Sequence, residues 1–249
     1  MEKVQIHAIR EGVEELDGRT PSGIPGLDEL CEGGFERQST VLVLGGAGCG
    51  KSIFLTQFLY SGASFYDEPG IFLSLEESRE RIRAHASQFG WDLKALEDEG
   101  KLAILNYKPH EMRKLSEEGG GMIWDTITEI GARRIAIDSL SSYVVFFGTQ
   151  YEAREAQLTL FDMVGKWKCT TVFSGEAVGN VSTKSQFGME YLSDAVIAMH
   201  RPKHDNSRGR AIEIFKMRGT NHSNKICPYD ILPNEGLVVY PKEEVFEKI

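Results

Sequence analysis

Long apolar runs are missing from this sequence of 249 residues. No hydrophobic stretch approaches the ~20 residues that a membrane-spanning helix needs. The first residues, Met1–Gln5, also lack the apolar segment of a secretory signal peptide. These absences argue against a membrane-inserted or secreted protein, and we expect a cytoplasmic one.

Cysteine is scarce, and its spacing follows no known pattern. The four cysteines, Cys31, Cys49, Cys169 and Cys227, are scattered and form no Cys-x-x-Cys pair. This argues against a disulfide scaffold and against a structural zinc site. Cys49 stands inside a glycine-rich loop, where it is either a small residue that the loop tolerates or a redox switch. The first interpretation is favoured.

Positive charge is also in short supply. Lysine and arginine number 28 against 37 acidic residues, and the formal net charge is -9. We therefore expect no broad nucleic-acid binding, because such binding depends on neutralising phosphates. A local basic cluster does occur in the short connection between two expected strands, where it is either a solvated hairpin tip or a binding site; it comprises Arg201, Lys203, His204, Arg208 and Arg210.

What the chain does contain is a phosphate-loop motif at Gly45–Ser52, Gly-Gly-Ala-Gly-Cys-Gly-Lys-Ser. An apolar run at 40–44 reads as a buried strand before it, and apolar residues of helical period follow at 53–59. Glycines let backbone N–H groups face the phosphates of a nucleotide, and the helix N-terminus adds partial positive charge. We expect the nucleotide to contact Gly46, Ala47, Gly48, Cys49, Gly50, Lys51, Ser52 and Ile53.

Carboxylates stand at the ends of two further apolar runs. Asp138 follows the run 135–137, in the arrangement of a Walker B strand, and would hold Mg²⁺ together with the Ser52 hydroxyl. Glu76 and Glu77 follow the run 71–75. They either align a water for phosphate hydrolysis or are merely acids at a helix N-terminus.

The order of elements predicts the fold class. Strands alternate with helices through most of the chain, which is typical of an α/β fold with a mainly parallel central sheet flanked by helices. The last strands have no helices between them and should be antiparallel. Residues 1–20 are expected to form an N-terminal arm, residues 21–249 a single domain, and residues 109–121 a polar loop.

Several motifs together resemble the KaiC family of ATPases, within the RecA superfamily of phosphate-loop nucleotidases. The similarity runs from about Arg19 to Pro241. It is carried by the segments Ser22–Asp28, Gly45–Ser52, Phe72–Glu77, Phe89–Leu93, Ile137–Ser141 and Phe215–His222. The last of these matches the family segment Lys-x-Arg-Gly-Ser/Thr-x-His.

The resemblance implies a RecA-like fold and a nucleotide shared between subunits of a ring. In the family, the segment that matches Phe215–His222 reaches the phosphates of the neighbouring subunit's ATP. Carried over, Lys216, Arg218 and His222 would act on that ATP, with Arg218 as an arginine finger. The same resemblance places Met217, Thr220 and Gln88 against the nucleotide. Without it, the charged residues could simply blunt a strand edge.

Two departures from the family pattern limit what is carried over. The best-known members have two tandem ATPase halves, whereas this chain resembles one, the first. Where the second half carries an autophosphorylated Ser-Thr pair, this chain has Glu190 and Tyr191. We therefore expect ATP hydrolysis without autokinase activity.

The sequence favours a magnesium-dependent ATPase that forms a ring, a homohexamer by resemblance, with an unidentified downstream protein partner. Glu76, Glu77, Lys216 and Arg218 would be catalytic. One alternative is a nucleotide-dependent scaffold with little turnover, similar to the archaeal motility-motor regulator. Another is a recombinase-like motor on single-stranded DNA, but the loop 177–190 has a single lysine, Lys184, and is poor in aromatic residues.

Overall fold

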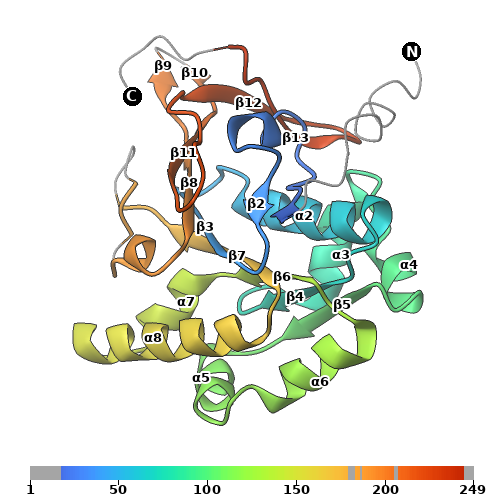
Figure 1. Ribbon diagram of the computed structural model, residues 1–249, viewed down its shortest axis with the longest axis vertical. Coiled ribbons are helices and arrows are strands. Elements are labelled where there is room, and N and C mark those ends of the chain that lie inside the picture. Colours follow the sequence, from blue (N-terminus) through green and yellow to red (C-terminus); the bar gives the residue numbers. More distant parts are fainter. Residues whose placement is uncertain (1–17, 179–182, 186, 205–206, 244–249) are drawn as a thin grey trace.

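The computed structural model describes residues 18–178, 183–185, 187–204 and 207–243. Their centre is a nine-stranded sheet in the order β13–β12–β11–β8–β3–β7–β6–β4–β5, which runs from the top to the bottom of Figure 1. Six neighbouring strands are parallel: β8 (Ala195–His200), β3 (Thr40–Gly45), β7 (Thr170–Glu176), β6 (Arg134–Asp138), β4 (Gly70–Ser74) and β5 (Leu102–Asn106). The other three are antiparallel: β11 (Ala211–Met217), β12 (Cys227–Leu232) and β13 (Gly236–Val239). The expected mainly parallel sheet with antiparallel C-terminal strands is confirmed.

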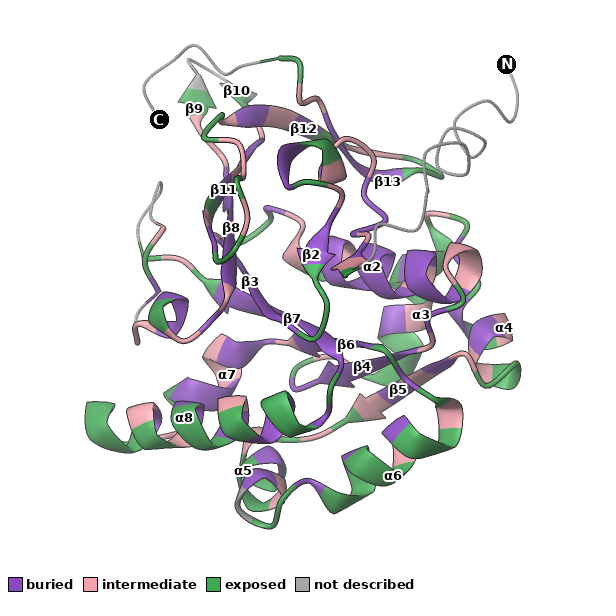
Figure 2. Ribbon diagram, viewed as in Figure 1, coloured by how far each residue is buried: buried purple, intermediate pink, exposed green. Residues whose placement is uncertain are grey.

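Helices cover both faces of the parallel strands. One apolar core includes residues of α2 (Lys51–Phe65), α3 (Arg79–Ser87) and α4 (Leu93–Asp98). The other includes residues of α5 (Pro109–Glu117), α6 (Gly121–Ile130), α7 (Leu140–Val145) and α8 (Gln150–Lys166). Alternate residues of β3 divide between the two cores, Val41 and Val43 in the first and Leu42 and Leu44 in the second, as the period of a strand requires. Figure 2 shows the buried sheet between helices whose outer sides are exposed.

Short elements complete the described chain. β1 (Arg19–Thr20) pairs with β2 (Phe35–Glu36), and the 3-10 turn η1 (Asp28–Leu30) lies between them in sequence. The turn η2 (Met189–Tyr191) precedes β8, and the hairpin β9 (Lys203–His204) and β10 (Ser207–Arg208) joins β8 to β11. Apart from Gly18–Thr20, the expected N-terminal arm lies outside the described residues. No helix of the described chain has the length and apolar character needed to cross a membrane.

The predicted polar loop at 109–121 is wrong, because most of it is helix α5. Pro109 occupies the first turn, where its missing N–H is no loss. The Glu111 carboxylate accepts a hydrogen bond from the Lys108 backbone N–H at 2.7 Å. Met112 is fully buried and anchors the helix to the second core. The polar composition reflects the exposed face of an amphipathic helix, and it hid the apolar face that carries Met112 and Leu115.

A buried ion pair ties the start of β6 to the turn that follows α2. Arg134 is completely buried, and its guanidinium lies 2.6 Å from Glu68 and stacks 4.6 Å from the centre of the Phe58 ring. It also donates to the Phe58 carbonyl at 2.9 Å. Removing one partner of such a pair costs about 3–5 kcal/mol, because the other charge is left buried. The pair therefore holds β6, and with it Asp138, in place against the helix that follows the phosphate loop.

The two edges of the sheet carry different segments. At the carboxyl edge of the parallel strands, Gly45 of β3 pairs with Met199 of β8. At the opposite edge, the last residue of β11, Met217, pairs with Ala195, the first residue of β8. The chain after Met217 therefore leaves the sheet at its amino edge, away from the loop that follows β3.

Candidate nucleotide site

The phosphate loop is built on two glycines in left-handed conformations. Gly48 has φ +76°, and Gly50, the N-cap of α2, has φ +94°. A Cβ on Gly50 would also lie 2.8 Å from Ile231 Cδ1 of β12. Because other residues rarely adopt these angles, the glycines fix the path of the backbone. The sequence folds here as the motif predicted.

Neighbouring strands hold the loop in place through Cys49. The Tyr229 hydroxyl donates a 2.5 Å hydrogen bond to the Cys49 carbonyl. The Cys49 thiol is buried and donates to the Met199 carbonyl at 3.4 Å. Burial raises the pKa of this thiol, which keeps it protonated and unreactive. The structure therefore assigns Cys49 a packing role, and no disulfide links any of the four cysteines.

Lys51 lies near the end of the phosphate loop, and its side chain folds back over that loop. Its Nζ donates to the carbonyls of Gly45 at 2.8 Å and Gly46 at 3.1 Å. The ammonium thus lies at the first residues of the loop, at the N-terminal end of a 15-residue helix. An ammonium and the positive end of a helix together favour an anion of high charge.

Ser52 and Asp138 meet across the gap between α2 and the end of β6. Burial raises the pKa of Asp138, and the charge of Glu76 adds to that rise. Hydrogen bonds from Ser174 and Ser52 and the charge of Lys51 act against it. Ser174 lies on β7, between the strands that carry the loop and Asp138. A hydroxyl and a carboxylate side by side are ligands of the kind that Mg²⁺ prefers, so these residues fit that ion.

Glu76 and Glu77 follow β4 and turn in different directions. The Glu76 carboxylate accepts hydrogen bonds from Ser139 at 2.5 Å and from Ser142, both at the start of α7. Glu77 forms a 3.2 Å contact with the imidazole of His85 on α3. The two carboxylates therefore have separate partners, as expected if they have separate roles in the site.

A cavity of about 200 Å³ joins this group to α3. It is lined by Ser52, Ile53, Thr56, Phe72, Ser74, Glu77, Ile82, His85, Ala86, Gln88, Phe89, Trp91 and Asp138. The rings of Phe89 and Trp91 stack 4.9 Å apart beside it. Gln88 thus shares one cavity with Ser52, Ile53 and Asp138. The apolar wall of this cavity could receive the base of a nucleotide.

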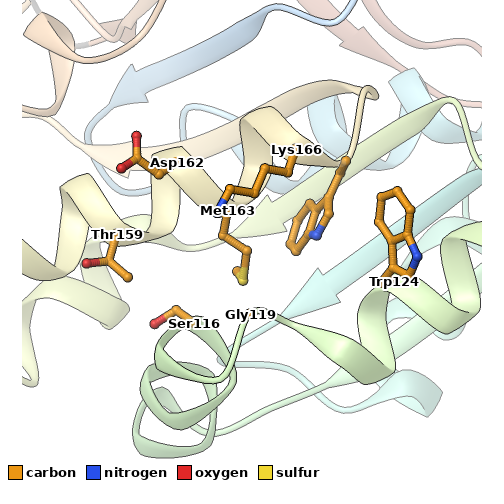
Figure 3. A pocket seen from close by; sticks show the side chains of 8 residues that line it. Ser116, Gly119, Trp124, Thr159, Asp162, Met163 and Lys166 are labelled. Atoms are coloured by element: carbon orange, nitrogen blue, oxygen red, sulfur yellow. The ribbon is translucent and has the colours of Figure 1, made fainter.

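A larger cavity of about 510 Å³ lies elsewhere, among α5, α6 and α8 (Figure 3). Its wall includes Trp124, Met163 and Trp167, with Asp162 and Lys166 on α8. None of the residues predicted for the nucleotide lines it. This cavity and the predicted chemistry therefore lie in different parts of the chain.

The cations predicted to act in catalysis lie away from the loop. Lys216 Nζ donates to the carbonyls of Ser193 at 2.6 Å and Glu190 at 3.1 Å. Burial lowers the pKa of this lysine, and the charge of Arg218 lowers it further. Arg218 is more than half exposed, and its guanidinium lies 3.2 Å from the Asp194 carboxylate.

The rest of that segment lies against the start of the described chain. Thr220 accepts a 2.7 Å hydrogen bond from Arg19. His222 contacts the Ser223 carbonyl through Nδ1 at 3.0 Å. The side chain of Met217 is buried in the first core.

The register of the strands keeps the phosphate loop apart from the segment 216–222 within one chain. Gly45 lies beside Met199, whereas Met217 lies beside Ala195. The four residue steps along β8 from Ala195 to Met199 span about 13 Å. Lys216 and Arg218 extend that separation, because they bind groups that precede β8. The structure therefore brings together the loop, Glu76, Glu77, Gln88 and Asp138, and it keeps the segment 216–222 apart from them.

Comparison with known proteins agrees with this arrangement. A family model described as "ATPase: KaiC" matches residues 20–244. The chain belongs to the KaiC family of ATPases. The family supports nucleotide binding by a RecA-like domain, which the loop and its surroundings are built to perform.

Relatives of two sizes share this domain. A UPF0273 protein of Methanocaldococcus jannaschii is 36 % identical over 240 residues, covering 90 % of this chain and 96 % of that protein. A circadian clock oscillator protein KaiC of Thermosynechococcus vestitus is 32 % identical over 234 residues, covering 90 % of this chain but 44 % of that protein. The crystal structure of a KaiC-like protein of Pyrococcus horikoshii superposes with TM-score 0.80 at 38 % identity, covering 90 % of this chain and 99 % of that chain.

Some residues of the site were not singled out from the sequence. Ser174, Ser142 and His85 each contact a predicted acidic residue. Ser174 carried a usable signal, since it is a polar residue near the end of a buried strand, where parallel strands gather their side chains. Ser142 and His85 lie on helix surfaces, and nothing in the sequence marked them as part of the site.

Proposed function

We propose that the chain is a magnesium-dependent ATPase that works as a homohexameric ring, with ATP between adjacent subunits. The proposal includes one ATPase domain at 21–249 and a regulatory role in the cytoplasm through a downstream protein partner. The observation that supports it most is the separation just described. One copy presents a phosphate loop and carboxylates at one edge of its sheet, and the cations Lys216 and Arg218 at the other.

Such a chain is complementary to a second copy of itself. When the amino edge of one subunit meets the carboxyl edge of the next, Arg218 and Lys216 approach a phosphate loop that their own chain cannot offer them. A contact between two different surfaces is heterologous, and it closes into a ring when the rotation between copies allows.

Within one subunit, the loop amides and Lys51 would bind the triphosphate. Ser52 and Asp138 would hold Mg²⁺, whose charge reduces repulsion among the phosphate oxygens. Glu76 would accept a proton from a water that attacks the γ-phosphorus, while the bond from that phosphorus to the bridging oxygen breaks and ADP leaves. Ser139 and Ser142 orient Glu76, and Glu77 supports it with its charge.

From the next subunit, Arg218 and Lys216 would offset charge that builds up on the transferred phosphoryl group. Arg218 is suited to this role because its present partner, Asp194, is exposed as well, and a surface ion pair is weak. Thr220 and His222 would line the same nucleotide, as in the family segment that they resemble.

Mixing two inactive variants tests the shared site. Lys51→Ala removes the loop cation, and Arg218→Ala removes the finger, so each variant alone should hydrolyse little ATP. In mixed rings, an intact loop from the Arg218→Ala subunit can meet an intact finger from the Lys51→Ala subunit. Random mixing of equal amounts should restore about a quarter of the parent turnover, because one boundary in four combines both intact parts.

Two controls make this result decisive. Mixing Lys51→Ala with Glu76→Gln should restore nothing, since both changes affect the same loop side of the boundary. Mass measurement with and without ATP and Mg²⁺ should show a ring of six. A fully active monomer, or no recovery in rings that are shown to exchange subunits, would refute action between subunits.

The alternative of a nucleotide-dependent scaffold has one observation in its favour. The Glu76 carboxylate accepts hydrogen bonds from two serine hydroxyls at one of its oxygens, Oε1, and such bonds stabilise the charged form and make it a weaker base. A ring that assembles with ATP but turns over far less than once per minute would support this role over hydrolysis.

A further inference from the structure

An arginine outside the family segment lies directly against the phosphate loop. β8 ends at His200, one residue beyond the Met199–Gly45 pair, so Arg201 emerges beside the point where the loop begins. A Cβ built on Gly48 would lie 2.7 Å from Arg201 Nη1. The guanidinium therefore occupies the space that the glycine leaves open, on the same chain as the loop.

Within the described ranges, the Arg201 guanidinium has an unpartnered Nε and no carboxylate partner. Its Nε is buried and has no hydrogen-bond partner. No carboxylate in the described ranges forms an ion pair with it, whereas Arg134 has Glu68 and Arg218 has Asp194. A buried donor without an acceptor is costly and calls for a ligand or water that supplies one.

The charge of Arg201 also reaches into the loop. Burial raises the pKa of the Cys49 thiol, and the charges of Lys51 and then Arg201 are the first to oppose that rise. The two cations thus flank the loop from different elements, Lys51 from α2 and Arg201 from the end of β8. Lys51 already donates to two loop carbonyls, but Arg201 Nε has no such acceptor.

We propose that Arg201 is a further phosphate-binding residue, which acts on the nucleotide held by the loop of its own chain. It donates to an oxygen of the di- or triphosphate beside Gly48. Guanidinium groups bind phosphate oxygens through two N–H groups at once, which an ammonium cannot do. This inference rests on nucleotide binding by the loop, but it does not depend on ring formation or hydrolysis.

The test is a set of binding measurements on the full chain in the Arg218→Ala background, where no finger from a neighbour contributes. Titration calorimetry with ADP and with ATP should show at least tenfold weaker binding for Arg201→Ala than for its parent. Arg201→Lys should recover only part of the loss. Arg208→Ala, an exposed arginine of the same hairpin, is the matched control and should bind as its parent does.

Pyrophosphate supplies a second measurement that involves no base or ribose. Its affinity should fall together with that of ADP if Arg201 binds phosphate. Equal affinity of Arg201→Ala and parent for both pyrophosphate and ADP, with unchanged melting temperature, would overturn the proposal. If Arg201→Ala unfolds, Arg201→Gln provides the comparison. Loss of these affinities in a chain that never forms rings would support Arg201 while refuting the ring.

Discussion

The two edges of the central sheet differ in how their polar groups are satisfied. At the carboxyl edge, side chains from β4, β6 and β7 contact one another, as Asp138 does with Ser174 and Glu76 with Ser139. At the amino edge, Lys216 and Arg218 bind backbone carbonyls and one exposed carboxylate. The first edge is an organised site with its own cations, Lys51 and Arg201, and the second carries further cations away from that site. Their difference suggests that each edge completes the other in a second copy.

The largest expected effect is loss of the cation at the amino edge. Arg218→Ala should lower the rate of ATP hydrolysis by about 1,000- to 100,000-fold, because an arginine finger stabilises charge in the transition state. ATP affinity should change far less, since the loop is intact. Arg133→Ala is the matched control, an exposed arginine at the same edge of the sheet. Hydrolysis by Arg218→Ala within threefold of the parent would leave the amino edge without a catalytic role.

Next in size is loss of the base at the carboxyl edge. Glu76→Gln should lower kcat by about 100- to 10,000-fold, with little change in KM, since the amide cannot accept the proton of water. Glu129→Gln, on the exposed side of α6, should be silent in the same steady-state assay. A Glu76→Gln variant as fast as its parent would show that another group is the base.

A smaller effect is expected from the hydroxyl that supports Asp138. Ser174→Ala removes a hydrogen bond to that carboxylate, so the Mg²⁺ concentration for half-maximal hydrolysis should rise several-fold. Maximal turnover at saturating Mg²⁺ should stay close to that of the parent. Ser87→Ala, at the end of α3, is the control. An unchanged Mg²⁺ response would mean that Asp138 does not serve the metal.

The smallest effect concerns the stability of the folded chain and depends on pH. Burial raises the pKa of Asp28 from 3.8 to about 6. Between these values the folded chain holds more protons than the unfolded one, so the contribution of Asp28 to stability decreases as pH rises. Asp28→Asn lacks this contribution. Its stability relative to the parent should therefore improve from pH 4 to pH 6.5, as measured by urea unfolding.

Asp28→Asn should leave ATP hydrolysis unchanged at pH 7, because the residue touches neither set of catalytic groups. Its carboxylate accepts from the Ser22 backbone N–H at 3.0 and 3.1 Å, and the exposed Glu29→Gln is the neighbouring control. A stability difference that is constant across this pH range would show that Asp28 has an ordinary pKa.

Local motifs were sufficient to predict one half of the site. The phosphate loop needs glycines at fixed positions, and Gly48 and Gly50 have the left-handed angles that the motif implies. Asp138 and the pair Glu76–Glu77 end strands of one parallel sheet, and the carboxyl ends of such strands meet at one edge. Pattern and topology together thus predicted that these groups would be neighbours.

Sequence alone failed where a few side chains decide an element. The polar stretch at 109–121 became α5 because Met112 reaches the core. Strand β12 was not anticipated, and it carries Tyr229, which fixes the Cys49 carbonyl. Arg201 belonged to a basic cluster for which the sequence favoured a solvated tip over a binding site, and only the β3–β8 register set it against Gly48.

By itself, the sequence determined the loop, the order of strands and the chemical kind of each side chain, because these depend on neighbours along the chain. Only the tertiary structure decided how far the phosphate loop lies from the segment 216–222. Pairing between distant strands sets that distance: Met217 beside Ala195 and Gly45 beside Met199 keep the family segment and the loop apart in one chain. A strand's length separates its two ends by a fixed rise per residue, and no local pattern contains that information.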